Sequence, residues 1–162
     1  MHIRNFRKED YPEIARIYEE GIATGMATFE TLVPQYEVWN QRMLKAGRLV
    51  AFEGDQLIGW AGLSATSKRA VYQGVAEVSI YLDPRFRGKG YGKLLLEALI
   101  TVSEEYGFWT LTASIFPQNK GSIALHESLG FRQLGRRERI AQLNGAWYDN
   151  LLFERRSKIV GI

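Results

Sequence analysis

The sequence contains no cysteine and only two histidines, His2 and His126. The lack of cysteine excludes disulfide bonds, a cysteine nucleophile, and zinc or iron–sulfur sites held by thiolates. Two histidines do not suffice for a histidine-rich metal site, so we predict no metal cofactor. A chain without cysteine is compatible with a reducing compartment, and we expect the protein to be cytoplasmic.

Long apolar runs are also missing. No run reaches the roughly 18 apolar residues of a membrane span, and residues 1–5 contain no signal-peptide core, so we expect no membrane partner. The charges nearly balance, since 21 Lys and Arg against 18 Asp and Glu leave a net charge of +3. This small excess, without a recognition motif, argues against a nucleic-acid partner bound through the arginines of residues 132–156.

The remaining composition is that of a folded globular protein. The chain has 162 residues, of which 46% are hydrophobic and 24% charged. A chain of this length suggests one domain and can bury one sizeable core. No repeat, linker or low-complexity stretch divides it, so we predict a single domain over residues 1–162.

Hydrophobic periodicity predicts strands that bracket helices, an α+β arrangement. Strands are expected over residues 2–6, 49–52, 57–61, 75–82, 109–115, 131–134 and 147–153. Helices are expected from a cap at Asp10 to Gly21, over 35–46, from the glycines at 88–92 to Gly107, and over 122–128. Asn144-Gly145 predicts a hairpin turn between the last two strands.

The most informative segment is Arg87-Gly88-Lys89-Gly90-Tyr91-Gly92-Lys93, between a predicted strand and a predicted helix. Unpaired N–H groups and the helix dipole make a helix N-terminus a binding site for anions. Glycine lets the backbone approach a phosphate closely, and Arg87, Lys89 and Lys93 add positive charge. The segment therefore predicts a phosphate-bearing ligand, although a glycine turn that only starts a helix is the alternative.

Two common phosphate motifs do not fit. A Walker loop needs four residues between its glycine and a Gly-Lys pair followed by Ser or Thr, whereas Leu94 follows Lys93 and the glycine spacing is shorter. A dinucleotide fingerprint needs Gly-x-Gly-x-x-Gly, whereas the order here is Gly-x-Gly-x-Gly. The remaining pattern, Arg87-x-x-Gly90-x-Gly92, resembles the acyl-CoA signature of the GNAT acetyltransferase family.

Other segments resemble the phosphinothricin and methionine sulfone N-acetyltransferase branch of that family. In order, they are Ala27 to Thr31, Arg69 to Tyr72, Glu77, the loop 87–92, Leu125-His126-Glu127 and Trp147-Tyr148-Asp149. Relatives often carry Lys near the position of Gln142, so substrate detail is expected to differ. The resemblance implies a GNAT-like fold, which is a mixed, mostly antiparallel sheet flanked by helices, and often a homodimer.

The resemblance also implies that acetyl-CoA is the acetyl donor and a co-substrate. Backbone groups of Ile80, Tyr81 and Leu82 would pair with pantetheine, and the loop would bind the diphosphate. Asn119 would cap the following helix, bond the pantetheine amide, or do both. The residues assigned to the diphosphate are Arg87, Gly88, Lys89, Gly90, Tyr91, Gly92 and Lys93.

Glu77 is the predicted general base. It is the only acid in an otherwise apolar predicted strand, and a solvent-facing strand residue is the alternative that the resemblance disfavours. A modest base suffices, because an α-amino group has a pKa of about 7.7–8.0 and a thiol of about 8.5 leaves readily as the thiolate. For His126 three roles stay open: to protonate the departing thiolate, to hydrogen-bond the acceptor, or to pack within its helix.

The resemblance assigns the acceptor side to Phe29 and to Arg69, Ala70, Val71 and Tyr72. The Arg69 cation suits a carboxylate or phosphinate. The predicted function is N-acetylation of a small amino-acid-like acceptor such as phosphinothricin, methionine sulfoximine or methionine sulfone. The alternatives are a protein N-terminus, a polyamine that Lys68 and Arg69 would repel, and a non-catalytic CoA-binding module.

Overall fold

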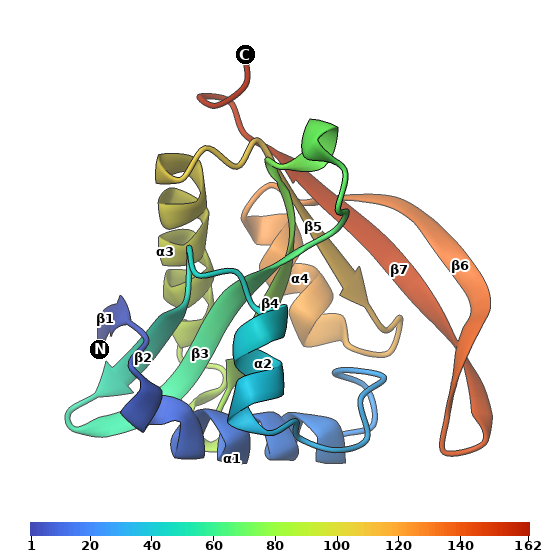
Figure 1. Ribbon diagram of the computed structural model, residues 1–162. Helices are drawn as coiled ribbons and strands as arrows, with labels where there is room; N and C mark the ends of the chain where they lie inside the picture. The colour runs from blue at the N-terminus through green and yellow to red at the C-terminus, as the bar shows by residue number, and fades with distance from the viewer.

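Seven strands form one sheet in the computed structural model, which describes residues 1–162 (Figure 1). The strands are β1 (His2–Asn5), β2 (Leu49–Glu53), β3 (Gln56–Ala65), β4 (Val75–Leu82), β5 (Thr110–Ile115), β6 (Arg132–Leu143) and β7 (Ala146–Arg156). Their order across the sheet is β1-β2-β3-β4-β5-β7-β6. All neighbours are antiparallel except β4 and β5, which confirms the mixed, mostly antiparallel sheet.

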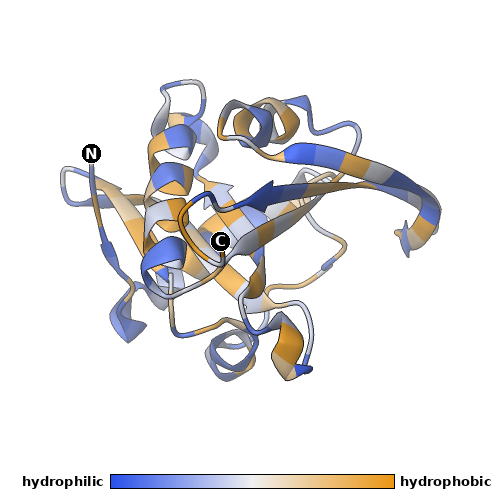
Figure 2. Cartoon of the chain, turned by 90° about the horizontal axis from the view of Figure 1, so that it is seen from above, coloured by the Kyte–Doolittle hydropathy of each residue, from blue (hydrophilic) through white to orange (hydrophobic).

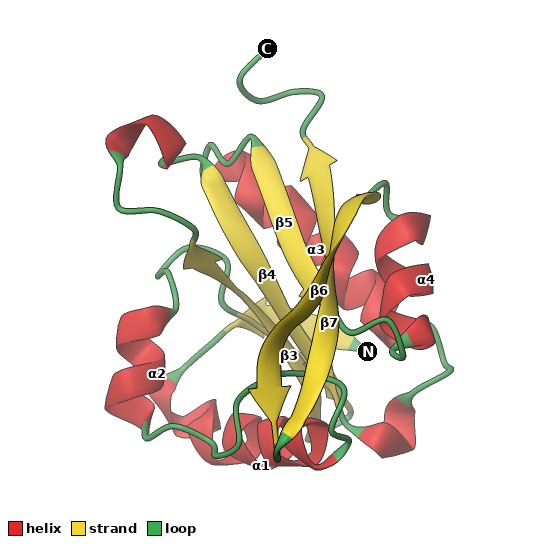
Figure 3. Ribbon diagram, turned by 90° about the vertical axis from the view of Figure 1, so that its right-hand side faces the viewer, coloured by secondary structure: helices red, strands yellow, loops and turns green.

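Four helices cover the two faces of the sheet. They are α1 (Tyr11–Ala23), α2 (Tyr36–Arg42), α3 (Tyr91–Glu105) and α4 (Lys120–Ser128), and short 3-10 turns form η1 (Lys8–Asp10), η2 (Ala70–Tyr72) and η3 (Pro84–Phe86). Helices α2 and α4 lie to opposite sides of the strands (Figure 3). None of the helices is long and apolar enough to cross a membrane.

A separate hydrophobic core fills each side of the sheet. On β2, Leu49 packs toward Leu95 and Leu99 of α3, whereas its neighbour Val50 packs toward Ile14 of α1. This alternation follows from the strand geometry, in which successive side chains point to opposite faces. Hydrophobic and hydrophilic residues alternate around α3, as expected for a helix with one buried face (Figure 2).

Two local predictions are wrong at helix ends. Asp10 does not cap α1, because it already has helical dihedral angles; its carboxylate instead accepts from the backbone N–H of Arg7 at 2.7 Å and pairs with Arg4 at 2.7 Å. The helix predicted over 35–46 ends at Arg42, because Met43 becomes extended and forms an isolated β-bridge with Ser64.

The sheet opens between β4 and β5. These parallel strands pair only through residues 75–77 of β4 and 110–112 of β5. Beyond this point β5 pairs with β7 up to Ile115, and residues 78–82 of β4 keep a partner on the β3 side only. One edge of β4 is therefore open over 78–82, where backbone groups are available to an extended ligand.

Strands β6 and β7 form a long hairpin that projects from the body of the molecule (Figure 1). Its turn, Asn144-Gly145, has both residues at positive φ, which confirms the predicted hairpin. A bulge between Arg137 and Ala141 bends β6 and puts Arg139 at φ 44°. Asp149 fixes this bulge by accepting from the backbone N–H of Arg139 at 2.8 Å.

Candidate active site

A cavity of about 480 Å³ lies where β4 and β5 separate. Strands β3, β4, β5 and β7 contribute residues to it, and the loop after α1, the end of α2 and helix α4 form its walls. The cavity brings together part of the predicted site. The predicted residues that line it are Phe29, Glu77, Ile80, Tyr81 and His126.

Glu77 lies on the floor of this cavity, at the point where the strands part. It stands opposite Ser64 on β3 and Thr112 on β5, so these three side chains share one face of the sheet. Burial raises the pKa of Glu77 above its usual value, while the charge of Arg137 and a hydrogen bond from Ser114 oppose this rise. A carboxylate with a raised pKa accepts a proton more readily, as a general base must.

His126 enters the cavity from α4 and is only 2% exposed. Its Nδ1 lies 2.8 Å from the carbonyl oxygen of Ser122, and because a carbonyl only accepts, Nδ1 must be the donor. Burial lowers the pKa of His126, so the ring is neutral near pH 7 and Nε2 carries a lone pair. In this state Nε2 accepts a proton or a hydrogen bond, and donation to a thiolate first requires protonation of the ring.

The glycine-rich loop leads into α3 in a form suited to a diphosphate. Gly88 and Gly90 have φ of 74° and 81°, and a Cβ at either position would meet no atom within 4 Å. The backbone conformation, rather than lack of space, therefore requires glycine at both. The backbone N–H groups of residues 88–92 have no backbone acceptor, and Arg87, Lys89 and Lys93 are exposed around them. These groups fit the diphosphate of CoA.

Tyr91 in this loop points toward the sheet and not toward the exposed N–H groups. Its hydroxyl donates to Oε1 of Glu53 on β2 at 2.5 Å, and its ring packs near Phe86. The residue anchors the start of α3. Any contribution of Tyr91 to the loop's anion site therefore comes from its backbone N–H.

Asn119 caps α4, as predicted, by accepting from the backbone N–H of Ser122 at 3.1 Å. Its Nδ2 donates to the carbonyl oxygen of Met26 at 3.3 Å. This second bond ties the start of α4 to the loop after α1, which carries Phe29. Whether Asn119 also bonds pantetheine stays a prediction.

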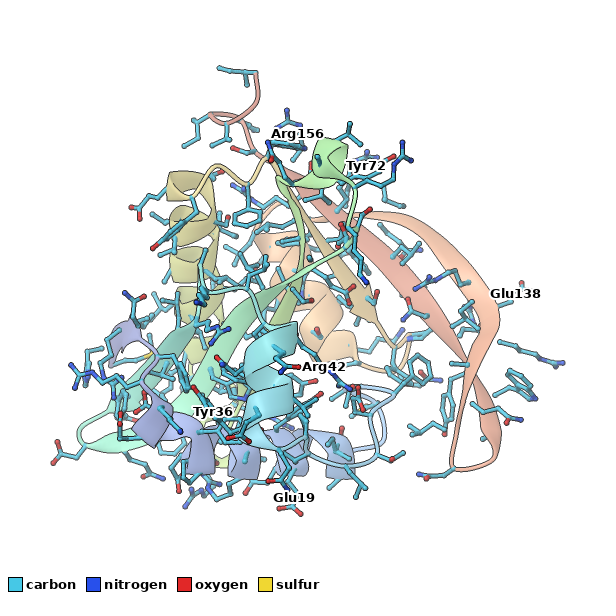
Figure 4. The ribbon with its side chains drawn as sticks, viewed as in Figure 1. Glu19, Tyr36, Arg42, Tyr72, Glu138 and Arg156 are labelled. Carbon is cyan, nitrogen blue, oxygen red and sulfur yellow. The ribbon has the colours of Figure 1, made fainter.

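The structure does not bring Arg69, Ala70, Val71 and Tyr72 into the cavity. Val71 is 65% and Tyr72 45% exposed on η2, and the guanidinium of Arg69 lies 5.5 Å from the ring centre of Tyr72. Figure 4 shows Tyr72 at the top of the molecule, away from Arg42 beside α2. Their role in acceptor binding stays a prediction that the geometry of one chain does not support. Leu82 does not line the cavity either, but it lies on the open edge of β4.

Residues 3–152 match the family described as Acetyltransferase (GNAT) domain. The chain belongs to the GNAT acetyltransferase family. A phosphinothricin N-acetyltransferase of Alcaligenes faecalis is 33% identical over 94% of this chain and 81% of its own. An L-methionine sulfoximine/L-methionine sulfone acetyltransferase of Pseudomonas paraeruginosa is 30% identical over 91% of this chain and 89% of its own.

A solved structure of a GNAT superfamily phosphinothricin acetyltransferase from Sinorhizobium meliloti, in complex with AcCoA, has the same fold. The TM-score is 0.89 and the identity 32%, over 99% of this chain and 90% of that chain. The predicted GNAT fold and the predicted family are thus confirmed.

Several lining residues of this GNAT acetyltransferase were not expected from the sequence. Asn150 on β7 is 4% exposed, and its Oδ1 lies 3.5 Å from Nη2 of Arg137. A guanidinium only donates, so Arg137 bonds the amide oxygen of Asn150. The amide N–H groups of Asn150 have no partner in the protein and are available to a ligand in the cavity. The sequence offers a weaker signal for Asn150 than for Glu77, because Asp149 directly precedes it and a pair of polar residues does not tell which of the two faces the cavity.

Aromatic rings form much of the cavity wall of the GNAT acetyltransferase. Trp60 and Tyr81 are stacked with ring centres 4.9 Å apart, and Tyr18 lies 4.7 Å from Tyr81. On the other side Phe29 packs on Phe116 at 4.6 Å. These contacts hold Phe29 at the cavity, as predicted, and surround the polar floor with apolar surface.

Proposed function

We propose that this GNAT acetyltransferase moves the acetyl group of acetyl-CoA to the amino group of a small amino-acid-like acceptor. The acceptors are of the phosphinothricin, methionine sulfoximine or methionine sulfone type. The opening of the sheet beside Glu77 carries this proposal, because it joins a half-buried carboxylate to the open edge of β4 in one cavity. The names of the relatives support the acceptor class, and a cavity of about 480 Å³ suits a small molecule.

In the proposed complex, the N–H groups of residues 88–92 and the cations of Arg87, Lys89 and Lys93 bind the diphosphate. Ile80, Tyr81 and Leu82 pair with pantetheine along the open edge of β4, in the manner of an added strand. A backbone N–H of this edge polarises the thioester carbonyl, which stabilises the charge that develops on its oxygen.

Glu77 takes a proton from the acceptor ammonium, directly or through water. The neutral amine then attacks the thioester carbon and a C–N bond forms. As the C–S bond breaks, the extra proton on the nitrogen passes to the departing thiolate, directly or through water, and CoA leaves as the free thiol. Nε2 of the neutral His126 ring accepts a hydrogen bond from the amine substrate and helps to orient it. Positioning of the reactants can lower the activation barrier by roughly 7–11 kcal/mol. One general base contributes about 10²–10⁴-fold in rate, or roughly 3–5 kcal/mol, so positioning accounts for more of the rate than Glu77 does.

A panel of amines tests the proposal. Free thiol is monitored with acetyl-CoA and phosphinothricin, methionine sulfoximine, methionine sulfone, a polyamine or a peptide with a free N-terminus. We expect release with the amino-acid-like acceptors. Release with the peptide alone contradicts the acceptor class, and heat of acetyl-CoA binding without thiol release for any amine supports a CoA-binding module instead.

Replacement of the base gives the first prediction for a variant. Glu77→Gln is expected to lower turnover by about 10- to 1,000-fold with little change in acetyl-CoA affinity, because the amide cannot accept the proton but fills the same space. Steady-state kinetics and calorimetry measure the two quantities. Turnover within about threefold of the parent rejects the role of Glu77.

We further propose that the enzyme is a cytoplasmic homodimer with no membrane or nucleic-acid partner. The near balance of positive and negative charge supports the absence of a nucleic-acid partner. Support for the dimer comes from the projecting hairpin of β6 and β7, on which Trp147 is 58% and Ile140 47% exposed. Exposed apolar side chains that gather on one element mark contact surfaces.

A further inference from the structure

Arg42 is the only lysine or arginine that lines the cavity. It is the last residue of α2, and its Nη1 lies 2.9 Å from Oε1 of Glu30, which also lines the cavity. That bond is the only one its guanidinium makes within the protein. Because a guanidinium has five N–H donors, Arg42 can keep Glu30 and bind a second carboxylate at the same time.

Backbone pairing puts Arg42 close to Glu77. Its neighbour Met43 bridges Ser64 on β3, and Ser64 in turn stands opposite Glu77 on β4. The backbone N–H of Leu44 donates to the carbonyl oxygen of Leu63 at 2.8 Å, which fixes this end of α2 against the sheet. Two strand spacings separate Met43 from Glu77, or about 10 Å between their backbones. Arg42 and Glu77 thus line the same cavity from neighbouring elements.

An α-amino acid carries its ammonium and carboxylate on the same carbon. When Glu77 receives the ammonium, the carboxylate needs a cation on the same cavity wall. Arg69 lies outside the cavity. The charge of Arg137 acts on Glu77, but Arg137 does not line the cavity, and it donates to Asn150 at 3.5 Å. The cations at 87–93 surround the proposed diphosphate site, where they are occupied by acetyl-CoA. Arg42 is the cation that remains.

We propose that Arg42 binds the α-carboxylate of the acceptor, so that the enzyme selects α-amino acids over simple amines. This inference rests on the proposed function. Glu30 takes only one N–H group of the guanidinium, and the ion pair itself is exposed, with 57% and 44% of the two side chains accessible. Removal of such a pair changes stability little, so a variant of Arg42 is expected to fold.

The test compares Arg42→Gln with the parent on methionine sulfone and on its decarboxylated analogue, 3-(methylsulfonyl)propylamine. We expect the KM of methionine sulfone to rise about 10- to 100-fold, as for loss of a charge-assisted contact, with the KM of acetyl-CoA unchanged. The analogue is expected to react poorly with both proteins and to show a change within about twofold. Arg42→Lys is expected to recover part of the loss.

Glu30→Gln is the matched control, because it breaks the same ion pair and keeps the guanidinium. We expect it to leave the KM of methionine sulfone unchanged or lower. An equal rise in both variants overturns the inference, since Arg42 then acts only by holding the loop through Glu30. A parent that uses acid and analogue equally well also overturns it, while a parent inactive on every amine overturns the proposed function instead. A large rise for Arg69→Ala without one for Arg42→Gln assigns the carboxylate to Arg69.

Discussion

Burial acts in opposite directions on the two titratable side chains of the cavity. It raises the pKa of Glu77 and lowers that of His126, so each is shifted toward its neutral form. For Glu77 this shift means that the ionised form required of a base is less favourable in the folded protein than in the unfolded chain. A functional carboxylate at this position therefore lowers the stability of the native state.

The stability of Glu77→Gln tests this reasoning. Because the folded pKa of Glu77 lies above the unfolded value of 4.5, its protonated form adds stability that is present below pH 4.5 and lost as the pH rises through the folded pKa. The neutral amide of the variant has no such dependence. We therefore expect the variant to melt at a higher temperature than the parent at pH 7–8, with the gap closing toward pH 4.5.

Thermal melts of the two proteins across pH 4.5–8 measure the difference. Glu105→Gln is the control, because it replaces an exposed carboxylate on α3 and is expected to show no such trend. A variant that melts below the parent at pH 7–8 contradicts the assignment of Glu77 as a half-buried carboxylate that destabilises the folded protein.

The site residues that could be predicted from the sequence are those whose side-chain type conflicts with their local pattern. Glu77 interrupts an apolar strand, and the glycines of 88–92 interrupt the start of a helix. Arg42 showed no such signal, since an arginine at a helix surface is ordinary. Its place in the cavity depends on the pairing of Met43 with Ser64, a contact between segments that lie far apart along the chain.

The glycine loop that starts α3 depends on backbone angles that only glycine adopts without strain. Gly90 is the N-cap at φ 81°, and Gly107, just past the other end of the helix, has φ 83°. A Cβ would meet nothing within 4 Å at either position. Alanine thus introduces the same backbone strain at both, about 1–2 kcal/mol, without a clash inside the protein.

Gly90→Ala and Gly107→Ala are therefore a matched pair. We expect both to lower the melting temperature by a similar amount, about 2–8 °C. Only Gly90→Ala is expected to raise the KM of acetyl-CoA, by roughly tenfold, because there the backbone must approach a phosphate. Melts and steady-state kinetics report the two effects, and an equal KM change in both variants contradicts the diphosphate assignment of the loop.

The ends of strands and turns agree with the prediction where neighbouring residues along the chain determine them. Strand β4 has the predicted bounds 75–82, and the turn at Asn144-Gly145 follows its dipeptide. Where pairing between strands decides, local patterns were insufficient: β6 runs to Leu143 rather than to residue 134, because it pairs with β7 across its arginines. Asp149 of the Trp-x-Asp segment matters here by fixing the bulge in β6.

Strand β6 also forms one edge of the whole sheet. An edge strand of this length invites pairing with another chain, and charged side chains are a common protection. Strand β6 carries four arginines, at 132, 136, 137 and 139, of which Arg132 and Arg136 pair with Glu154 and Asp149 of β7. The charges of Arg137 and Arg139 remain without an acidic partner and oppose pairing with the same edge of a second copy. The proposed dimer is therefore expected to use the apolar side chains of the hairpin, such as Trp147, rather than continuous sheet pairing across this edge.

Sedimentation velocity tests this arrangement. The parent is expected to sediment as a species of twice 18.5 kDa, and Trp147→Glu as a monomer, because a buried unpaired carboxylate is incompatible with an apolar contact. Tyr106→Glu, at a similarly exposed aromatic residue past the end of α3, is the control and is expected to stay dimeric. A monomeric parent contradicts the dimer, and a Trp147→Glu variant that stays dimeric shows that the contact does not involve Trp147.

The same variant shows whether one chain makes a complete cavity. Trp147 lies outside the cavity, so a monomeric Trp147→Glu variant that keeps the parent's turnover per chain would show that each cavity is complete within one chain.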